Sequence, residues 1–113
     1  MAKLIVQILR LDPPFPDVDR PNRTLYIDAT AADNLKISEL VTTGQISNIH
    51  FVVGDKNVLM DGTLHSLEFP FGNIIRLTES ALEFFKLRSG KRYWVEWNQN
   101  LRTLKILREV DGK

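Results

Sequence analysis

Residues 74–90 read IIRLTESALEFFKLRSG, and this stretch decides the fold. It opens with a strand-like apolar run, after which Thr78 or Ser80 offers a side-chain oxygen that can cap a helix. Glu83 follows Ser80 at the spacing of a capping box. The apolar face of the helix would consist of Ala81, Leu82, Phe84 and Phe85. The stretch therefore predicts a strand and then a short helix that ends at Arg88-Ser89-Gly90.

The same pattern occurs 50 positions earlier in the chain. When Lys36 is aligned with Lys86, residues 25–37 (LYIDATAADNLKI) align with residues 75–87. Identity is low, but apolar and polar positions mostly match. The first helix would be capped by Asp28 or Thr30. We therefore expect two diverged copies of one structural unit.

Further strands are expected around both copies. Each copy would begin with a strand that a proline ends, and each would close with a hairpin whose turn has favourable residues. The first strands are expected at 3–11 and 63–69, and the hairpins at 49–60 (turn 54–57) and 93–107 (turn 98–100). The first copy adds a proline-rich loop at 12–22 and about six residues within 40–47.

This order predicts a mainly β protein with two short helices. The fold would be a pseudo-twofold β-barrel of the cradle-loop (swapped-hairpin) type, formed by two strand-strand-helix-strand-strand repeats. Residues 1–113 would form a single domain. The first copy would span 3–60, the second copy 63–107, and residues 108–113 would be a flexible tail.

The second hairpin allows a residue-by-residue prediction, because side chains on a strand alternate between two faces. The inward set would be Tyr93, Val95 and Trp97, and the outward set Arg92, Trp94 and Glu96. A tight turn would place Val95 opposite Leu104 and Trp94 opposite Lys105. Trp94 could then hold the cations Arg92 and Lys105 against its ring.

The order of elements resembles the swapped-hairpin domain of the AbrB-like transcription regulators, in the cradle-loop barrel group. The likeness rests on residues 72–78 (GNIIRLT), residues 81–90 (ALEFFKLRSG) and the hairpin that follows. The chain departs from the family pattern at Asp28 and Thr78, where proline is usual, and at Gly90-Lys91, where an acidic residue usually follows the glycine. Tandem copies resemble the MraZ-type arrangement. The resemblance implies a packed barrel with functional loops, and related folds host DNA binding, flavin binding and catalysis alike.

Charge is unevenly distributed along the chain, whose net charge is +1. Residues 1–70 hold 6 Lys or Arg against 9 Asp or Glu, whereas residues 71–113 hold 9 against 5. The basic second half permits a nucleic-acid partner without requiring one. The lack of cysteine excludes disulfides and thiol chemistry. With no signal-peptide or membrane pattern, we expect a cytoplasmic protein, or a virion-associated one if the source is viral.

No set of residues specifies a catalytic, cofactor or metal site. His50 and His65 lie in apolar strands, which favours structural roles. Gly54-Asp55-Lys56 and Ser89-Gly90-Lys91 lack the spacing of a phosphate loop and are typical of turns. Carboxylates with no defined separation occur at Asp17, Asp19, Asp33 and Asp61. We therefore expect no enzyme and no cofactor.

Basic residues interleaved with Trp94 are the strongest functional signal. They are Arg76, Lys86, Arg88, Lys91, Arg92, Arg102, Lys105 and Arg108. The group is either an ordinary solvated face, a contact with a phosphate backbone, or a protein interface anchored by Trp and Arg. Our first hypothesis is a non-enzymatic, oligomeric protein interaction or assembly module, such as a bacterial accessory or phage structural component. The alternative is an AbrB-like DNA-binding transcription regulator; no membrane or small-molecule partner is indicated.

Overall fold

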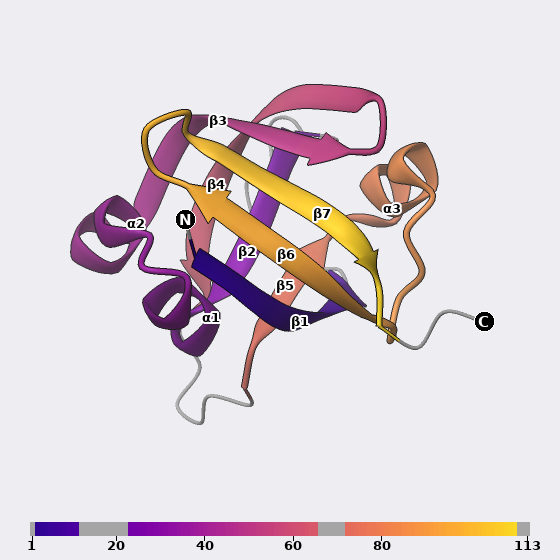
Figure 1. Cartoon of the computed structure of the whole chain (residues 1–113), viewed down its shortest axis with the longest axis horizontal. Coiled ribbons are helices and arrows are strands. Elements are labelled where there is room, and N and C mark those ends of the chain that lie inside the picture. The colour runs from indigo at the N-terminus through magenta and orange to yellow at the C-terminus, as the bar shows by residue number, and fades with distance from the viewer. Residues whose placement is uncertain (1, 12–22, 66–71, 111–113) are drawn as a thin grey trace.

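A barrel dominates the computed structural model, which describes residues 2–11, 23–65 and 72–110. Its strands are β1 Ala2–Arg10, β2 Thr24–Asp28, β3 Gln45–Val53, β4 Lys56–His65, β5 Ile74–Leu77, β6 Arg92–Asn98 and β7 Thr103–Glu109. Within the described ranges these seven strands close in the order β1-β5-β2-β4-β3-β7-β6 (Figure 1). The predicted mainly β fold and the predicted barrel are confirmed.

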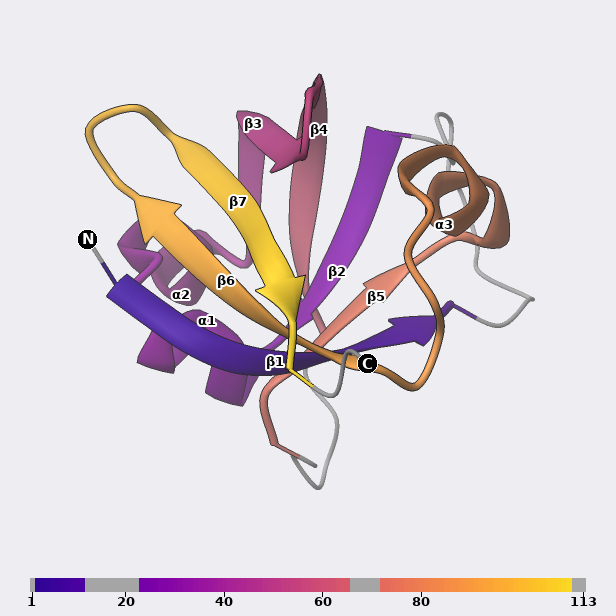
Figure 2. The ribbon, with the colours of Figure 1, turned by 45° about the vertical axis from the view of Figure 1, so that its right-hand side comes forward.

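Three short helices accompany the described strands, where the sequence predicted two. They are α1 Ala29–Asn34, α2 Ser38–Thr43 and α3 Glu79–Phe85. Helices α1 and α2 lie together on one side of the barrel and α3 lies on the opposite side (Figure 1, Figure 2). The additional helix, α2, falls largely within the residues expected as an insertion. It buries Leu40 and ends at Gly44, whose positive φ of 79° suits glycine.

The ends of α3 differ from the prediction. Thr78 is the N-cap, and its hydroxyl oxygen accepts a hydrogen bond from the Ala81 amide at 3.2 Å. The predicted capping box of Ser80 with Glu83 was wrong, because Ser80 already lies inside the helix. Lys86 adopts a left-handed conformation (φ 56°) and ends the helix at Phe85, before Arg88-Ser89-Gly90.

Strand β4 corrects a second prediction. The hairpin strand expected to end at residue 60 and the strand expected at 63–69 are one continuous element, with residues 66–69 outside the described ranges. Its residues pair with β3 on one side, antiparallel, and with β2 on the other, parallel. Gly62 lies inside this strand and faces Ile46, whose Cγ2 would be 3.0 Å from an added Cβ.

The second hairpin has the predicted faces but not the predicted register. Tyr93, Val95 and Trp97 are buried, as expected from the alternation. Val95 lies opposite Ile106 rather than Leu104, and Trp94 lies opposite Arg108 rather than Lys105. The cause is a longer turn over residues 99–102 together with an irregularity between Trp94 and Val95.

The tail predicted at 108–113 was wrong for residues 108–110. Strand β7 continues to Glu109, and the Val110 amide donates a hydrogen bond to the Arg92 carbonyl at 2.8 Å. Residues 111–113 lie outside the described ranges.

The core fills the barrel and extends beneath the helices. The largest fully buried side chains include Trp97, Phe51 and Met60. Phe85 of α3 packs edge-on against Phe51, with ring centroids 4.9 Å apart. Each such side chain stabilises the fold by roughly 1.5–3 kcal/mol through apolar burial. The filled interior leaves the outer wall as the place to look for function.

Candidate interaction surface

The outer wall formed by β5, β1, β6 and β7 brings predicted functional residues together. Inward residues of β1 and β6 alternate with outward ones, so the outward residues of neighbouring strands share one surface. We call this surface the Trp94 face. Its outward residues are Lys3, Ile5, Gln7, Leu9, Ile74, Arg76, Arg92, Trp94, Glu96, Lys105 and Arg108.

Trp94 lies near the middle of this face. Its cross-strand neighbours are Ile5 on β1 and Arg108 on β7. Trp94 and Ile5 are both half-buried, so part of each side chain remains open to a partner. Leu9, further along β1, is half-buried as well and lies opposite Arg76 of β5. The face therefore offers a broken apolar strip across neighbouring strands.

Cations surround that strip. Arg92, Lys105 and Arg108 are exposed, and the Lys3 side chain is 58% exposed. Among the described outward positions of these strands the carboxylate is Glu96, which lies 3.9 Å from the Lys3 ammonium and opposite Lys105. An exposed pair of this kind contributes little stability.

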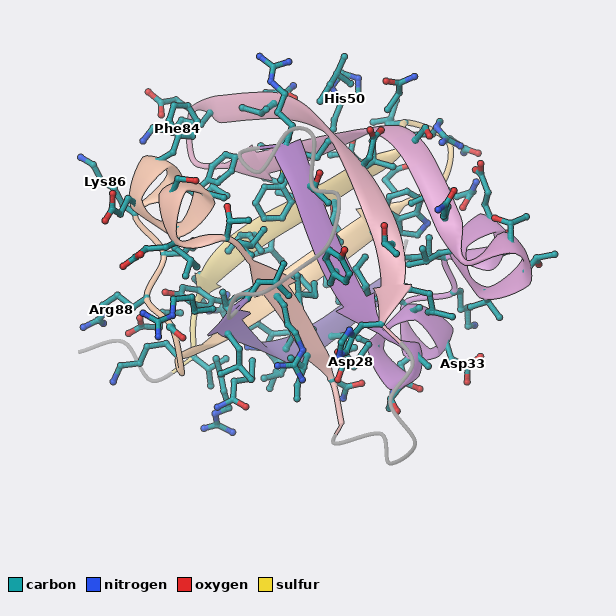
Figure 3. All side chains as sticks on the ribbon, turned by 180° about the vertical axis from the view of Figure 1, so that it is seen from behind. Asp28, Asp33, His50, Phe84, Lys86 and Arg88 are labelled. Atoms are coloured by element: carbon teal, nitrogen blue, oxygen red, sulfur yellow. The ribbon has the colours of Figure 1, made fainter. Side chains whose placement is uncertain are left out.

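The nine residues grouped from the sequence, eight cations and Trp94, do not form one cluster. Five of them lie on the Trp94 face: Arg76, Arg92, Trp94, Lys105 and Arg108. Lys86 and Arg88 lie beside α3, away from Asp28 (Figure 3). Lys91 follows them in the segment that leads into β6.

Arg102 forms hydrogen bonds with residues away from the Trp94 face. Its guanidinium donates to a Glu39 carboxylate oxygen at 2.8 Å and to the Ser47 carbonyl at 2.7 Å. These bonds connect the β6–β7 turn to α2 and to β3. Arg102 therefore serves the fold at the end of the barrel opposite α3.

Arg88 is likewise engaged within the chain. Both Glu109 carboxylate oxygens accept a hydrogen bond from its Nη2 at 2.8 Å, and these bonds raise the pKa of Arg88. The bidentate pair connects the segment after α3 to the end of β7. The Tyr93 hydroxyl adds a further tie by accepting a hydrogen bond from the Arg88 amide at 3.0 Å.

Arg76 has the least usual surroundings of the predicted residues. Its Nε lies 3.4 Å from Oδ1 of Asp28, whose side chain is 3% exposed. Both of these atoms are buried and neither makes a hydrogen bond within the described residues. The terminal guanidinium nitrogens are not among the buried unpaired atoms. The buried Asp28 carboxylate therefore contacts the Nε side of the Arg76 guanidinium and helps to fix its position.

The histidines have structural neighbours. His50 Nδ1 is 2.9 Å from the Asn57 side-chain oxygen across the β3–β4 hairpin. The His65 ring meets Tyr26 edge-on, with centroids 5.9 Å apart. Within 2–11, 23–65 and 72–110, no group of three or more His, Asp or Glu side chains could hold a metal ion. Asp17 and Asp19 lie outside these ranges.

Lys3, Ile5 and Leu9 belong to the Trp94 face, but the sequence did not assign them to a site. Lys3 and Ile5 lie there because β1 pairs with β6, some 90 positions away in the chain, and Leu9 because β1 pairs with β5. The signal that could have found them is the alternation of β1, in which Leu4, Val6 and Ile8 face inward. That alternation gives the outward residues but not the partner strand.

Comparison with known proteins gave no relative. Neither the family models nor the curated proteins match the sequence, and no solved structure matches the fold. The resemblance to AbrB-like regulators therefore stays a prediction. Among the described helices, none is long and apolar enough to cross a membrane.

Proposed function

We propose that this chain is a non-enzymatic interaction module that binds an acidic protein surface through the Trp94 face. The observation that carries the proposal is an accessible tryptophan beside aliphatic neighbours and surrounded by cations on one wall of the barrel. Trp and Arg are the residues that most often anchor protein interfaces. A ring of cations favours a partner of negative charge and speeds the encounter.

Two features favour a protein over a nucleic acid as the partner. The Glu96 carboxylate stands between Lys3 and Lys105, where it would repel a phosphate backbone. The described strands of the face are paired side by side in the wall of a closed barrel, whereas the elements that fit a DNA major groove are a helix or a separate two-stranded ribbon. An acidic protein surface with an apolar centre would complement both the apolar strip and the cations around it.

A DNA-binding transcription regulator of the AbrB-like kind is the second candidate. The exposed cations of the face, Lys3, Arg92, Lys105 and Arg108, are the observation in its favour. Phosphate contacts alone give binding that weakens steeply with salt. Salt dependence is therefore the property that separates the two candidates.

We include in the proposal that the barrel consists of two copies of one duplicated unit. The pairing of the described strands supports this duplication. Tyr26 lies opposite Arg76 in the β2–β5 pair, with register symmetric about these two residues. The parallel pairs β1–β5 and β2–β4 lie on either side of it. The closed wall leaves no free strand edge among the described strands, so self-association would use a face. A cytoplasmic or virion-associated role remains part of the same proposal.

The test measures Trp94 fluorescence during titration with a Glu-rich peptide that carries Leu and Phe, and with a duplex oligonucleotide. Trp97 is 2% exposed and its indole NH donates to Gln99 at 3.0 Å, so a ligand-dependent change reports mainly on Trp94. Saturable peptide binding, weakened about tenfold or more by Trp94→Ala, supports the proposal.

Leu59→Ala is the matched control, because Leu59 is 44% exposed on β4, away from the face. It should leave peptide affinity unchanged. Tighter binding to the duplex than to the peptide, with a steep salt dependence, favours the DNA-binding candidate. Binding that Leu59→Ala weakens as much as Trp94→Ala contradicts both candidates.

A further inference from the structure

A hollow of about 240 Å³ lies where the end of β1, strand β5 and the segment after α3 meet. Its lining residues are Leu9, Arg10, Arg76 and Ser89. We call it the Arg76 hollow. Two guanidinium groups and a hydroxyl in one small recess form a donor set suited to an oxyanion.

Arg76 is prepared for such a ligand by its surroundings. The buried Asp28 carboxylate lies 3.4 Å from Nε and fixes one side of the guanidinium. The structure gives no hydrogen bond for the guanidinium within the described residues, and its terminal nitrogens are not among the buried unpaired atoms. A guanidinium held in this way offers planar, paired donors to a phosphate or carboxylate.

The other walls provide complementary contacts. Ser89 Oγ accepts the Arg10 amide hydrogen at 2.9 Å, which fixes the oxygen and leaves its proton for a ligand. The Arg10 guanidinium lies 3.9 Å from Glu79, and these side chains are 52% and 70% exposed. A long, exposed pair of this kind is weak, so an incoming anion can compete with this Glu79 contact, which is one of the interactions that Arg10 makes. Leu9 supplies an apolar wall beside the polar donors.

We propose that the Arg76 hollow binds a phosphate group, either as free phosphate or as a small phosphate monoester. Phosphate is favoured over a carboxylate because three separate donors line the hollow and a phosphate has more acceptor oxygens to satisfy them. This site shares Leu9 and Arg76 with the Trp94 face but lies further along β1 than Ile5, the neighbour of Trp94. Its occupant is a small molecule rather than a protein.

The experiment follows backbone and arginine side-chain NMR signals during titration with inorganic phosphate and, separately, with phenyl phosphate at constant ionic strength. Saturable shifts at Arg76 and Ser89 are expected. Tighter binding of phenyl phosphate would assign the site to an ester whose apolar part lies on Leu9. Equal binding would assign it to free phosphate.

Variants decide whether the hollow is responsible. Arg76→Lys keeps a positive charge beside Asp28 and should weaken phosphate binding about tenfold, and Ser89→Ala should weaken it less. Ser89→Ala removes no buried charge, so it keeps the test valid if Arg76→Lys does not fold. Lys36→Gln is the matched control, because Lys36 lines a different hollow of about 270 Å³. The other residues that line that hollow are Ala2, Leu35, Trp97 and Gln99.

Two results would overturn the assignment. The first is a linear response to phosphate with no saturation, which indicates ionic screening. The second is saturable binding that Lys36→Gln weakens as much as Arg76→Lys and Ser89→Ala do.

Discussion

The segment from β2 through α1 and the segment from β5 through α3 follow nearly the same backbone path with different side-chain chemistry. Asp28 and Thr78 have matching N-cap angles, φ −63°, ψ 148° and φ −65°, ψ 158°. A left-handed lysine follows each helix: Lys86 (φ 56°) is the C-cap of α3, and Lys36 (φ 60°) comes directly after Leu35, the C-cap of α1. The shared path shows that the backbone does not depend on which residue occupies the cap.

The closing hydrogen bonds agree as well. The Lys36 amide donates to the Asp33 carbonyl at 3.0 Å, and the Lys86 amide donates to Glu83 at 3.2 Å. The next residues, Ile37 and Leu87, donate to carbonyls five positions earlier, at 3.0 and 2.9 Å. Such agreement at equivalent positions is what duplication of one unit would leave.

The capping positions differ in what they do. Thr78 caps α3, whereas the Asp28 side chain makes no capping bond to α1 and contacts Arg76 instead. Helix α1 therefore relies on packing: Ala31 and Ala32 are fully buried, as are Leu35 and Ile37 just beyond the helix. The β5–α3 segment uses its capping position for local stability, and the β2–α1 segment uses it to hold a residue of the outer wall.

Of the substitutions that test this difference between the two capping positions, Arg76→Ala should have the largest effect on stability. It leaves the Asp28 carboxylate buried without its cation, and the expected loss in the free energy of unfolding is about 3–5 kcal/mol. Urea unfolding of the purified variant measures it. The double variant Asp28→Asn with Arg76→Ala should recover part of the loss, because no buried charge then remains. Additive losses in the two single variants would show that the pair is not coupled.

Thr78→Ala sharpens the comparison at the other cap. Loss of the hydrogen bond to the Ala81 amide should reduce the free energy of unfolding by about 1 kcal/mol. Thr30→Ala is the control, because Thr30 lies inside α1 and Asp28 is the N-cap there. Thermal unfolding should therefore show a larger decrease in Tm for Thr78→Ala. Equal decreases would mean that the Thr78 cap contributes nothing specific.

Lys36→Gly and Lys86→Gly make the smallest expected change and test whether the two helix ends are equivalent. The left-handed backbone conformation is sterically unfavourable for both lysines, whereas glycine adopts it freely. Each substitution should therefore stabilise the fold by about 0.5–1 kcal/mol. Chemical unfolding should give similar values for the two variants. Stabilisation in one and destabilisation in the other would show that the two ends differ.

Local patterns carried most of the fold prediction. The strand-then-helix pattern and the 50-residue offset placed β2, β5, α1 and α3 correctly. The boundary expected between residues 60 and 63 was wrong, because β4 continues through Gly62, where the lack of a side chain admits Ile46. The register of the last hairpin failed because turn length and the irregularity beside Trp94 depend on tertiary packing.

The candidate site was only partly predictable. Outward placement of Arg92 and Trp94 followed from alternation along β6. The charge pattern could not show that Arg88 and Arg102 pair with Glu109 and Glu39, because those partners are far apart in the chain. The contribution of Lys3 depended on the pairing of β1 with β6, which strand alternation alone does not give.

The most direct test of the central claim maps where an acidic partner binds. Backbone NMR shifts are recorded while a Glu-rich peptide carrying Leu and Phe is added to the isotope-labelled chain. Binding at the Trp94 face predicts that the largest changes fall on Ile5, Trp94, Lys105 and Arg108. Changes concentrated around Leu59 on β4 or Leu101 in the β6–β7 turn would contradict it, because these exposed apolar residues lie off that face.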